Sequence, residues 1–380
     1  MVKKVLASVF LAAFVAGSAW ADLSGNFRSF YLNRYYSTPA SQESLAVGGW
    51  LQYDAQVWQG VNLRLAAYTS QGSIFTDSNH GGGGLLTPAQ KGYLVLGQAN
   101  LNAKAGKTDI ILFRQALDTP FINTFDVKMT PVLVEAYTVK SQLSPKASVV
   151  FSHLTKIKGW TETEFKPLSN KPVSLGGLVL APRENIQLQV WEYFCDDFMN
   201  VMYTQADGNW QLPNGNIISA SFQSFDQRSL GQAIGGNFTT GMYGLQAKYT
   251  LSKGPGFSLA FTSTNKNHDI VNPWGAYPGF TSIIEEDNDL AGEQAVTVGG
   301  VTDFGKVGPA ALSASLYHTR SYLLDKGSFA DPDQLETDLT LSFQFDQHLI
   351  LRLRGAVVNN SLDTGRANYT SFRAIINHDF

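Results

Sequence analysis

The chain has 380 residues, of which 44% are hydrophobic and only 16% are charged, and its formal net charge is −3 at pH 7. This mild acidity argues against a nucleic-acid-binding protein, because such proteins present a basic face. Beyond the first residues, no run approaches the roughly 18 uncharged apolar residues that a membrane-spanning helix needs, which excludes a helical membrane protein.

The N-terminus has the pattern of a secretory signal peptide. Lys3-Lys4 precede the apolar stretch Val5–Val15, and small residues then lead to the cleavage pattern A-W-A at residues 19–21. A segment of this kind is removed on export. We therefore predict a signal peptide over residues 1–21 and a mature protein over residues 22–380. Because the signal holds two lysines and no acids, the mature net charge becomes about −5.

The remaining sequence alternates between apolar and polar residues almost everywhere, which indicates β-strands. Clear examples are Gly244–Leu251, Leu339–Asp346 and Leu349–Arg354. These stretches run about 10–14 residues, whereas strands of soluble domains peak near 5–6 and a tilted transmembrane strand needs about 9–11. In lipid every backbone polar group must be paired, so such strands must close on themselves. The predicted fold is all-β: a transmembrane antiparallel up-and-down β-barrel whose polar face lines a water-filled lumen.

Turn signals set the predicted number of strands. Eight short connections occur, at Gln59-Gly60, Ala105–Lys107, Ser144–Lys146, Pro182–Glu184, Pro213–Gly215, Lys253–Gly256, Gly305–Gly308 and Gln347-His348. Longer segments rich in Gly, Asn and Asp separate them and fit extracellular loops. Eight turns and nine loops join 18 strands, although soft boundaries around residues 174–200 leave 16 strands open. The last predicted strand, 368–380, ends on Phe380, a terminal aromatic that typically marks a protein for the barrel-assembly machinery, a predicted partner.

No residue pattern indicates an enzyme. The Gly106–Thr108 segment resembles the end of a phosphate-binding loop, but the required first glycine falls at Leu101, and no G-x-S-x-G motif occurs. The six histidines are scattered without ligand spacing, so we predict neither a metal nor another cofactor. Cys195 is the only cysteine, and we interpret it as a small buried apolar residue.

Strand parity places several arginines on the lumenal face. First, second, third and last strands are neighbours in a closed barrel, so arginines on these strands and on the one before the last could share one wall. Guanidinium groups bind carboxylates bidentately, and a row of them lets an anion pass from one to the next. The predicted basic pore wall consists of Arg28, Arg64, Arg352, Arg354 and Arg373. The alternative interpretation is that these arginines only hydrate the lumen and pair with nearby acids.

A pore of 18 strands would leak without something folded into it. Two loops are candidates for a constriction, Asp118–Pro131 and a segment from about His268 to Gly292. An acidic loop opposite a basic wall creates a transverse field that orients a charged or dipolar solute. The candidate constriction residues are Asp118, Asn123, Asp126, Lys128, Glu285, Asp287 and Asp289.

At these loops the chain resembles the OprD family of outer-membrane porins. The similar segments are LDTPFIN (117–123), DVKMTP (126–131) with Glu135, NPWGAYPGF (272–280) with AGE (291–293), LRLRGA (351–356), RAIIN (373–377) and FYLNR (30–34). The resemblance implies an 18-stranded, narrow, substrate-selective barrel in the outer membrane of a Gram-negative bacterium, present as a monomer or a loose oligomer. It also implies a basic ladder facing an acidic constriction. Lys128 departs from the pattern, since the family commonly has arginine there, and the short chain implies trimmed loops.

The function that we predict is passive uptake of small polar solutes, which are carboxylate-bearing nutrients, amino acids or peptides. The alternative is a porin for chito-oligosaccharides or other sugars, because the family contains such channels and fold does not set substrate. In that alternative, loop aromatics would stack on sugar rings; the candidates are Trp160, Trp191, Trp210, Trp274 and Tyr277. Aromatics also belong to the interfacial girdles of any membrane barrel. A third hypothesis is an outer-membrane enzyme or a purely structural barrel. The sequence shows no nucleophile–base set that would support an enzyme.

Overall fold

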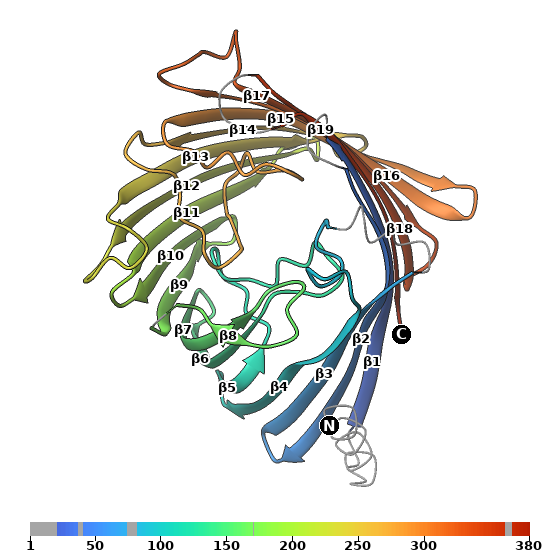
Figure 1. Cartoon of the computed structure of the whole chain (residues 1–380), viewed down its shortest axis with the longest axis vertical. Helices are drawn as coiled ribbons and strands as arrows, with labels where there is room; N and C mark the ends of the chain where they lie inside the picture. The colour runs from blue at the N-terminus through green and yellow to red at the C-terminus, as the bar shows by residue number, and fades with distance from the viewer. Residues whose placement is uncertain (1–20, 37–40, 74–81, 170, 362–366) are drawn as a thin grey trace.

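A computed structural model describes residues 21–36, 41–73, 82–169, 171–361 and 367–380, which form a barrel of antiparallel strands (Figure 1). The strands are β1 (Ala21–Tyr36), β2 (Gln42–Trp58), β3 (Val61–Gly72), β4 (Tyr93–Ala105), β5 (Thr108–Gln115), β6 (Leu133–Ser144), β7 (Ala147–Lys158), β8 (Lys166–Pro167), β9 (Val173–Arg183), β10 (Ile186–Cys195), β11 (Met199–Gln211), β12 (Ile217–Ser229), β13 (Thr239–Thr250), β14 (Gly256–Thr264), β15 (Glu293–Val307), β16 (Ala310–Leu323), β17 (Gln334–Gln344), β18 (Leu349–Asn360) and β19 (Tyr369–Asp379). Among the described residues, no helix is long and apolar enough to cross a membrane.

Eighteen strands close the ring. Each strand pairs with its neighbour in the chain, and β1 pairs with both β2 and β19. The two-residue strand β8 pairs only with the end of β7, which itself pairs directly with β9. The prediction of an 18-stranded antiparallel barrel is therefore confirmed, and the alternative of 16 strands is wrong.

All eight predicted short turns connect consecutive strands, so they lie together at one end of the barrel, the turn end. The nine other connections lie at the opposite end, the loop end. The predicted signal peptide falls on residues 1–20, which lie outside the described residues, and on Ala21, the first residue of β1. Cys195 is buried and reduced, as its interpretation requires.

The predicted alternation gives the barrel two chemically different faces. Large apolar side chains on its outside are about half exposed, for example Phe151, Leu245, Leu316 and Leu339. Their chain neighbours point inward and are mostly polar, as on β17, where Asp338 and Thr340 flank Leu339. An outer apolar band with a polar interior is what a barrel in lipid requires.

The seam beside β1 depends on a close approach of two strands. Gly49 of β2 has φ of 124°, and a Cβ atom built there would lie 1.8 Å from the carbonyl oxygen of Asn26 on β1. Only glycine tolerates both this backbone conformation and this contact. On the other side of β1, the backbone N–H and C=O of Gly25 pair with Phe380 at 2.9 Å each.

An apolar core fills one side of the lumen. Phe121, from the connection between β5 and β6, makes edge contacts with Tyr193, Tyr203 and Phe225 of the wall. Trp274, from the connection between β14 and β15, stacks on Tyr193 and is 1% exposed. The strands β10 to β13 therefore form a packed side of the lumen, whereas β17 to β19 with β1 form the side that carries the charges.

Candidate solute-binding constriction

The first predicted constriction loop lies inside the barrel. Besides the packing of Phe121, its backbone amide donates to the hydroxyl of Tyr193 at 3.2 Å. Further along, the carboxylate of Asp126 receives two hydrogen bonds from Arg28, at 2.7 and 2.8 Å. The indole N–H of Trp160 donates to the carbonyl of Phe125 at 2.9 Å. These contacts attach the loop to both sides of the lumen.

The second predicted loop crosses the lumen from the packed side to the charged side. On the packed side, the side-chain amide of Gln227 on β12 makes two hydrogen bonds with the backbone of Val271, at 2.9 and 3.0 Å. On the charged side, the carboxylate of Glu336 on β17 accepts the backbone N–H groups of Glu285 and Glu286, at 2.8 and 3.1 Å. The loop tip is thus held against the wall by a carboxylate that the sequence interpretation missed.

The side chain of Glu285 lies between two arginines of the wall. It forms ion pairs with Arg34 of β1 and Arg373 of β19, and only 2% of the Glu285 side chain and 4% of the Arg373 side chain are exposed. Burial opposes ionisation, but Arg373 and Arg34 hold the pKa of the Glu285 carboxyl below its ordinary value. The group is therefore a carboxylate in a site formed by two guanidinium groups.

A third loop, between β3 and β4, also enters the lumen, which the sequence interpretation did not predict. Leu85 and Leu86 are buried against Phe30, Leu32 and Met129. The carbonyl of Gly83 accepts a hydrogen bond from the ammonium group of Lys128 at 2.7 Å. An apolar pair in a glycine-rich loop was the available signal in the sequence.

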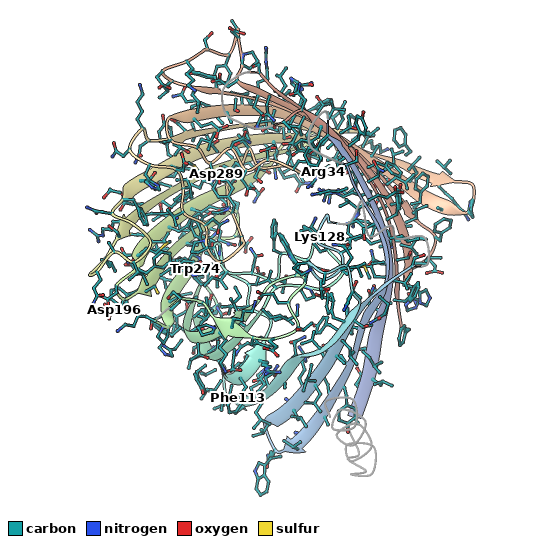
Figure 2. The ribbon with its side chains drawn as sticks, in the orientation of Figure 1. Arg34, Phe113, Lys128, Asp196, Trp274 and Asp289 are labelled. Carbon is teal, nitrogen blue, oxygen red and sulfur yellow. The ribbon has the colours of Figure 1, made fainter. Side chains whose placement is uncertain are left out.

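Lys128 is buried among positive charges. Burial lowers the pKa of this ammonium group to about 7, with a further contribution from the nearby guanidinium groups of Arg373 and Arg34, while Glu285 opposes the shift. Figure 2 shows Lys128 and Arg34 on one side of the lumen and Trp274 on the other. Lys128 thus lies on the charged side of the lumen.

Four of the five predicted wall arginines cluster. Arg354 and Arg373 are direct cross-strand partners on β18 and β19, and Arg352 lies two residues from Arg354 on the same face. Arg28 also bonds the side chain of Asn377 on β19, at 2.7 Å. Arg64 lies apart: its partner Asp54 is aligned with Asp22, six residues along β1 from Arg28, which is about 20 Å.

The arginines differ in their partners. Arg28, Arg373 and Arg64 form ion pairs, Arg64 with Asp54 at 2.7 Å. Arg352 and Arg354 form no ion pair with any residue in the described ranges. Like charges directly opposite each other on neighbouring strands are unfavourable, so the Arg354–Arg373 pair favours anions beside it.

The remaining predicted constriction residues have mixed positions. Asp118 is exposed on the first loop, and Asn123 uses its side chain within that loop, accepting the backbone N–H of Phe125 at 2.8 Å. Asp287 accepts a hydrogen bond from Ser282 at 2.7 Å, and the carbonyl of Asp289 accepts from Ile270 at 2.8 Å. Asn123, Asp287 and Asp289 thus make hydrogen bonds within their own loops, and Asp126, Lys128 and Glu285 meet the charged wall.

A cavity of about 270 Å³ lies beside the second loop, and basic residues are at two places in its lining. Arg354 lines it from β18 and Lys248 from β13. Phe280 and Ile283 come from the loop, and no described residue of the lining is acidic. Polar groups complete the wall; they are Gln246, Ser258, Ser282, Thr297, Ser315, Tyr317 and Thr340. The cavity thus combines two cations, several hydroxyl groups and an apolar surface.

A larger cavity of about 630 Å³ lies toward the turn end, where Arg64, Asp54 and Asp22 line it. Amide side chains provide much of its remaining polar surface; they are Gln56, Asn62, Gln98, Asn100, Asn102 and Gln115. Within the described ranges, no three His, Cys, Asp or Glu residues come together as a metal site would require.

Parity alone could have found two of the residues that the sequence interpretation missed. Arg34 is six residues from Arg28 on the same strand, and Lys248 belongs to the polar face of the alternating segment 244–251. Glu336 shares a face with Asp338 and Thr340, which indicates the lumen. Its contact with the loop joins residues about fifty positions apart, and no local pattern reports it.

These features define a class: a closed membrane barrel whose lumen is narrowed by inserted loops, with charged residues at the constriction. The family model described as "outer membrane porin, OprD family" matches residues 12–380, so the chain belongs to the OprD family, whose members are outer-membrane porins of Gram-negative bacteria. A search of curated proteins finds no match.

Solved structures share the fold. OccK9 (OpdG) of Pseudomonas aeruginosa is similar with a TM-score of 0.85 at 18% identity, covering 95% of this chain and 98% of that one. OccAB2 of Acinetobacter baumannii has a TM-score of 0.83 at 16% identity, over 96% and 98% of the two chains. OpdK of Pseudomonas aeruginosa, solved with vanillate, has a TM-score of 0.81 at 14% identity, over 96% and 99%.

Proposed function

We propose that the chain is a passive channel for small solutes that carry a carboxylate, including amino acids and peptides. The observation that carries this proposal is the pair Arg352 and Arg354, which face the lumen without an ion pair in the described structure while Arg354 lines the 270 Å³ cavity. A guanidinium group without a carboxylate partner in a partly dry site favours an incoming carboxylate, because two parallel hydrogen bonds then form.

The cavity supports a small organic anion rather than an inorganic ion alone. Its 270 Å³ lies just below the volumes of about 300–1,000 Å³ that are typical of small-molecule sites, which suits a small solute. Arg354 and Lys248 supply positive charge, hydroxyl groups supply polar contacts, and Phe280 supplies an apolar face. A solute with a carboxylate and a short apolar or polar body satisfies all three.

The alternative of a sugar channel finds less support in the aromatics. Trp191 and Trp274 are buried in the packed half of the lumen, and Tyr277 packs against Phe225. Trp210 is half exposed at the end of β11 that adjoins a turn, where an interfacial girdle is expected. Trp160 contacts the first loop. A sugar ring would therefore need to displace packed side chains before it could stack on most of them.

We also propose that the channel transforms none of its solutes, since the acids nearest the arginines serve as ion-pair partners and backbone acceptors. The loop end would face the cell exterior. Phe380, whose backbone pairs with Gly25 between the first and last strands, would be recognised by the barrel-assembly machinery. Because one chain encloses its own lumen, a monomer or loose oligomer suffices for transport.

Single-channel recording in a planar bilayer tests the proposal. The reversal potential in a potassium chloride gradient is expected to show anion preference, and millimolar vanillate is expected to interrupt the current. Removing one charge about 7 Å from the path of a permeating ion changes the energy of that ion by about 0.6 kcal/mol in water. This corresponds to about a threefold change in the permeability ratio of anions to cations.

The variant Arg354→Ala should therefore lower the anion preference about threefold and shorten vanillate events. Arg183→Ala, which removes an exposed arginine beside the turn between β9 and β10, is the matched control and should change neither. A preference that is the same in Arg354→Ala and in the wild type contradicts the proposal. Interruption by neutral oligosaccharides alone would instead favour the sugar channel.

A further inference from the structure

The carboxylate of Glu285 lies on the charged side of the lumen, between two guanidinium groups. It bonds Arg34 and Arg373 from two different strands, and the side chains of Glu285 and Arg373 are almost completely buried. Arg373 is in turn the direct cross-strand partner of Arg354. One carboxylate of the protein thus already holds a terminal nitrogen of each of the two guanidinium groups, and one of these arginines adjoins Arg354 of the cavity lining.

Hydrogen bonds to the wall position the part of the second loop that carries Glu285. Glu336 accepts the backbone N–H groups of Glu285 and Glu286, and the hydroxyl of Tyr369 on β19 donates to the Glu286 side chain at 2.8 Å. The two backbone bonds position the start of the acidic segment against β17, and the Tyr369 hydroxyl adds a contact with β19. Neither Arg34 nor Arg373 takes part in these bonds, so the anchor and the ion pairs are separate contacts.

We propose that Glu285 is a tethered competitor of the solute and determines the specificity of the channel: its carboxylate holds Arg34 and Arg373, and a solute carboxylate gains them only by displacing it. The inference rests on the proposed carboxylate transport and adds a residue that limits it. A group held on a short tether acts at an effective concentration of millimolar or more, so it outcompetes dilute free carboxylates.

The competition has a functional consequence. A solute that found Arg34, Arg373, Arg354 and Arg352 all free would bind tightly and leave slowly, and a channel conducts only when its sites release their occupants. With Glu285 in place, a monocarboxylate meets the free guanidinium groups of Arg352 and Arg354 first. Tight binding is then restricted to solutes that can also displace the loop carboxylate.

The test compares Glu285→Gln with wild type by single-channel recording, with sodium acetate and sodium benzoate as probes. The matched control is Asp207→Asn, which removes one lumenal acid whose bonds are to the side chains of Gln205 and Ser221 on the packed side. In Glu285→Gln, the apparent dissociation constants of both carboxylates should fall about tenfold and the anion preference should rise at least threefold. In Asp207→Asn, the dissociation constants should stay within twofold of wild type.

A loosened loop is distinguished from lost competition by a neutral solute. Arabinose flux into liposomes should change less than twofold in Glu285→Gln, whereas wider opening would raise arabinose and acetate flux together. Glu285→Asp, which keeps the charge, should restore most of the wild-type affinity. Glu336→Gln, which weakens only the anchor, should tighten carboxylate binding by a smaller factor than Glu285→Gln.

The failures are separable. If Arg373→Ala weakens carboxylate binding but Glu285→Gln leaves it unchanged, the transport proposal stands and the competition is refuted. If arabinose flux rises as much as acetate flux in Glu285→Gln, the residue is only a steric element and the inference is likewise refuted. If no arginine replacement alters carboxylate binding, both the transport proposal and the inference fail.

Discussion

The ammonium group of Lys128 should make the channel sensitive to pH near neutrality. Its pKa is lowered from 10.5 to about 7 by burial and by the guanidinium groups of Arg373 and Arg34. The charged form is thus disfavoured by about 5 kcal/mol relative to water. Around pH 8 about a tenth of the molecules carry this charge, and around pH 6 about nine tenths do.

The effect on permeation follows from Coulomb's law. A charge about 7 Å from a passing anion contributes between about 0.6 and 2.4 kcal/mol, for effective dielectric constants of about 80 and 20. Because water fills part of the lumen, the lower value applies best, and it corresponds to about a threefold change. Anion preference should therefore rise about threefold as pH falls from 8 to 6. The free energy of unfolding should fall as pH falls from 10.5 toward 7. In that range the lysine binds a proton in the unfolded chain but not in the folded protein.

The assay is the reversal potential in a potassium chloride gradient, recorded between pH 5.5 and 9 for wild type and Lys128→Met. Methionine keeps the volume and removes the charge. Lys253→Met, at an exposed turn, controls for the loss of one lysine. A titration that is superimposable in wild type and Lys128→Met refutes the reasoning, as does a midpoint above pH 9, which would mean that the ammonium group is solvated.

Two further predictions concern the barrel itself. Phe121→Ala should destabilise the folded barrel by about 3–5 kcal/mol, because it empties a fully buried site between Tyr193 and Phe225; a urea midpoint in detergent that equals that of wild type would contradict this. Gly49→Ala should abolish the compact species on unheated gels, because its Cβ atom would lie 1.8 Å from a carbonyl oxygen. The control Gly355→Ala should fold normally, because no atom lies within 4 Å of its new Cβ atom. Equal folding of the two variants would contradict the prediction and show that the contact between β1 and β2 adjusts.

The barrel was predictable from the sequence because its rules are local. Alternation sets the face of each residue, and a turn such as Gln59-Gly60 sets where a strand ends. The same parity predicted a lumenal face for Arg352, Arg354 and Arg373. Neighbourhood in a closed ring then brought the first and last strands together, and the register of Arg28 with Asn377 shows that contact.

The constriction was less predictable because loops lack a period. The acidity of residues 285–289 predicted a negative surface facing the wall, but Glu285 is enclosed by two arginines and Asp287 bonds within its own loop. Arg34 and Glu285 are 251 residues apart, so only the folded loop brings them together. The partner of Lys128 was equally unpredictable from the sequence, because it is the backbone carbonyl of Gly83, a group that every residue possesses.

The division of the lumen into a packed half and a charged half bears on how such a channel can evolve. Replacing Phe121 or Trp274 disturbs close packing that holds two loops in place, so substitutions there destabilise the fold. Replacing Lys248 or Arg352 alters charge beside water and leaves that packing intact. Solute preference can therefore diverge through a few substitutions on one side of the tube, while selection for foldability acts mainly on the other.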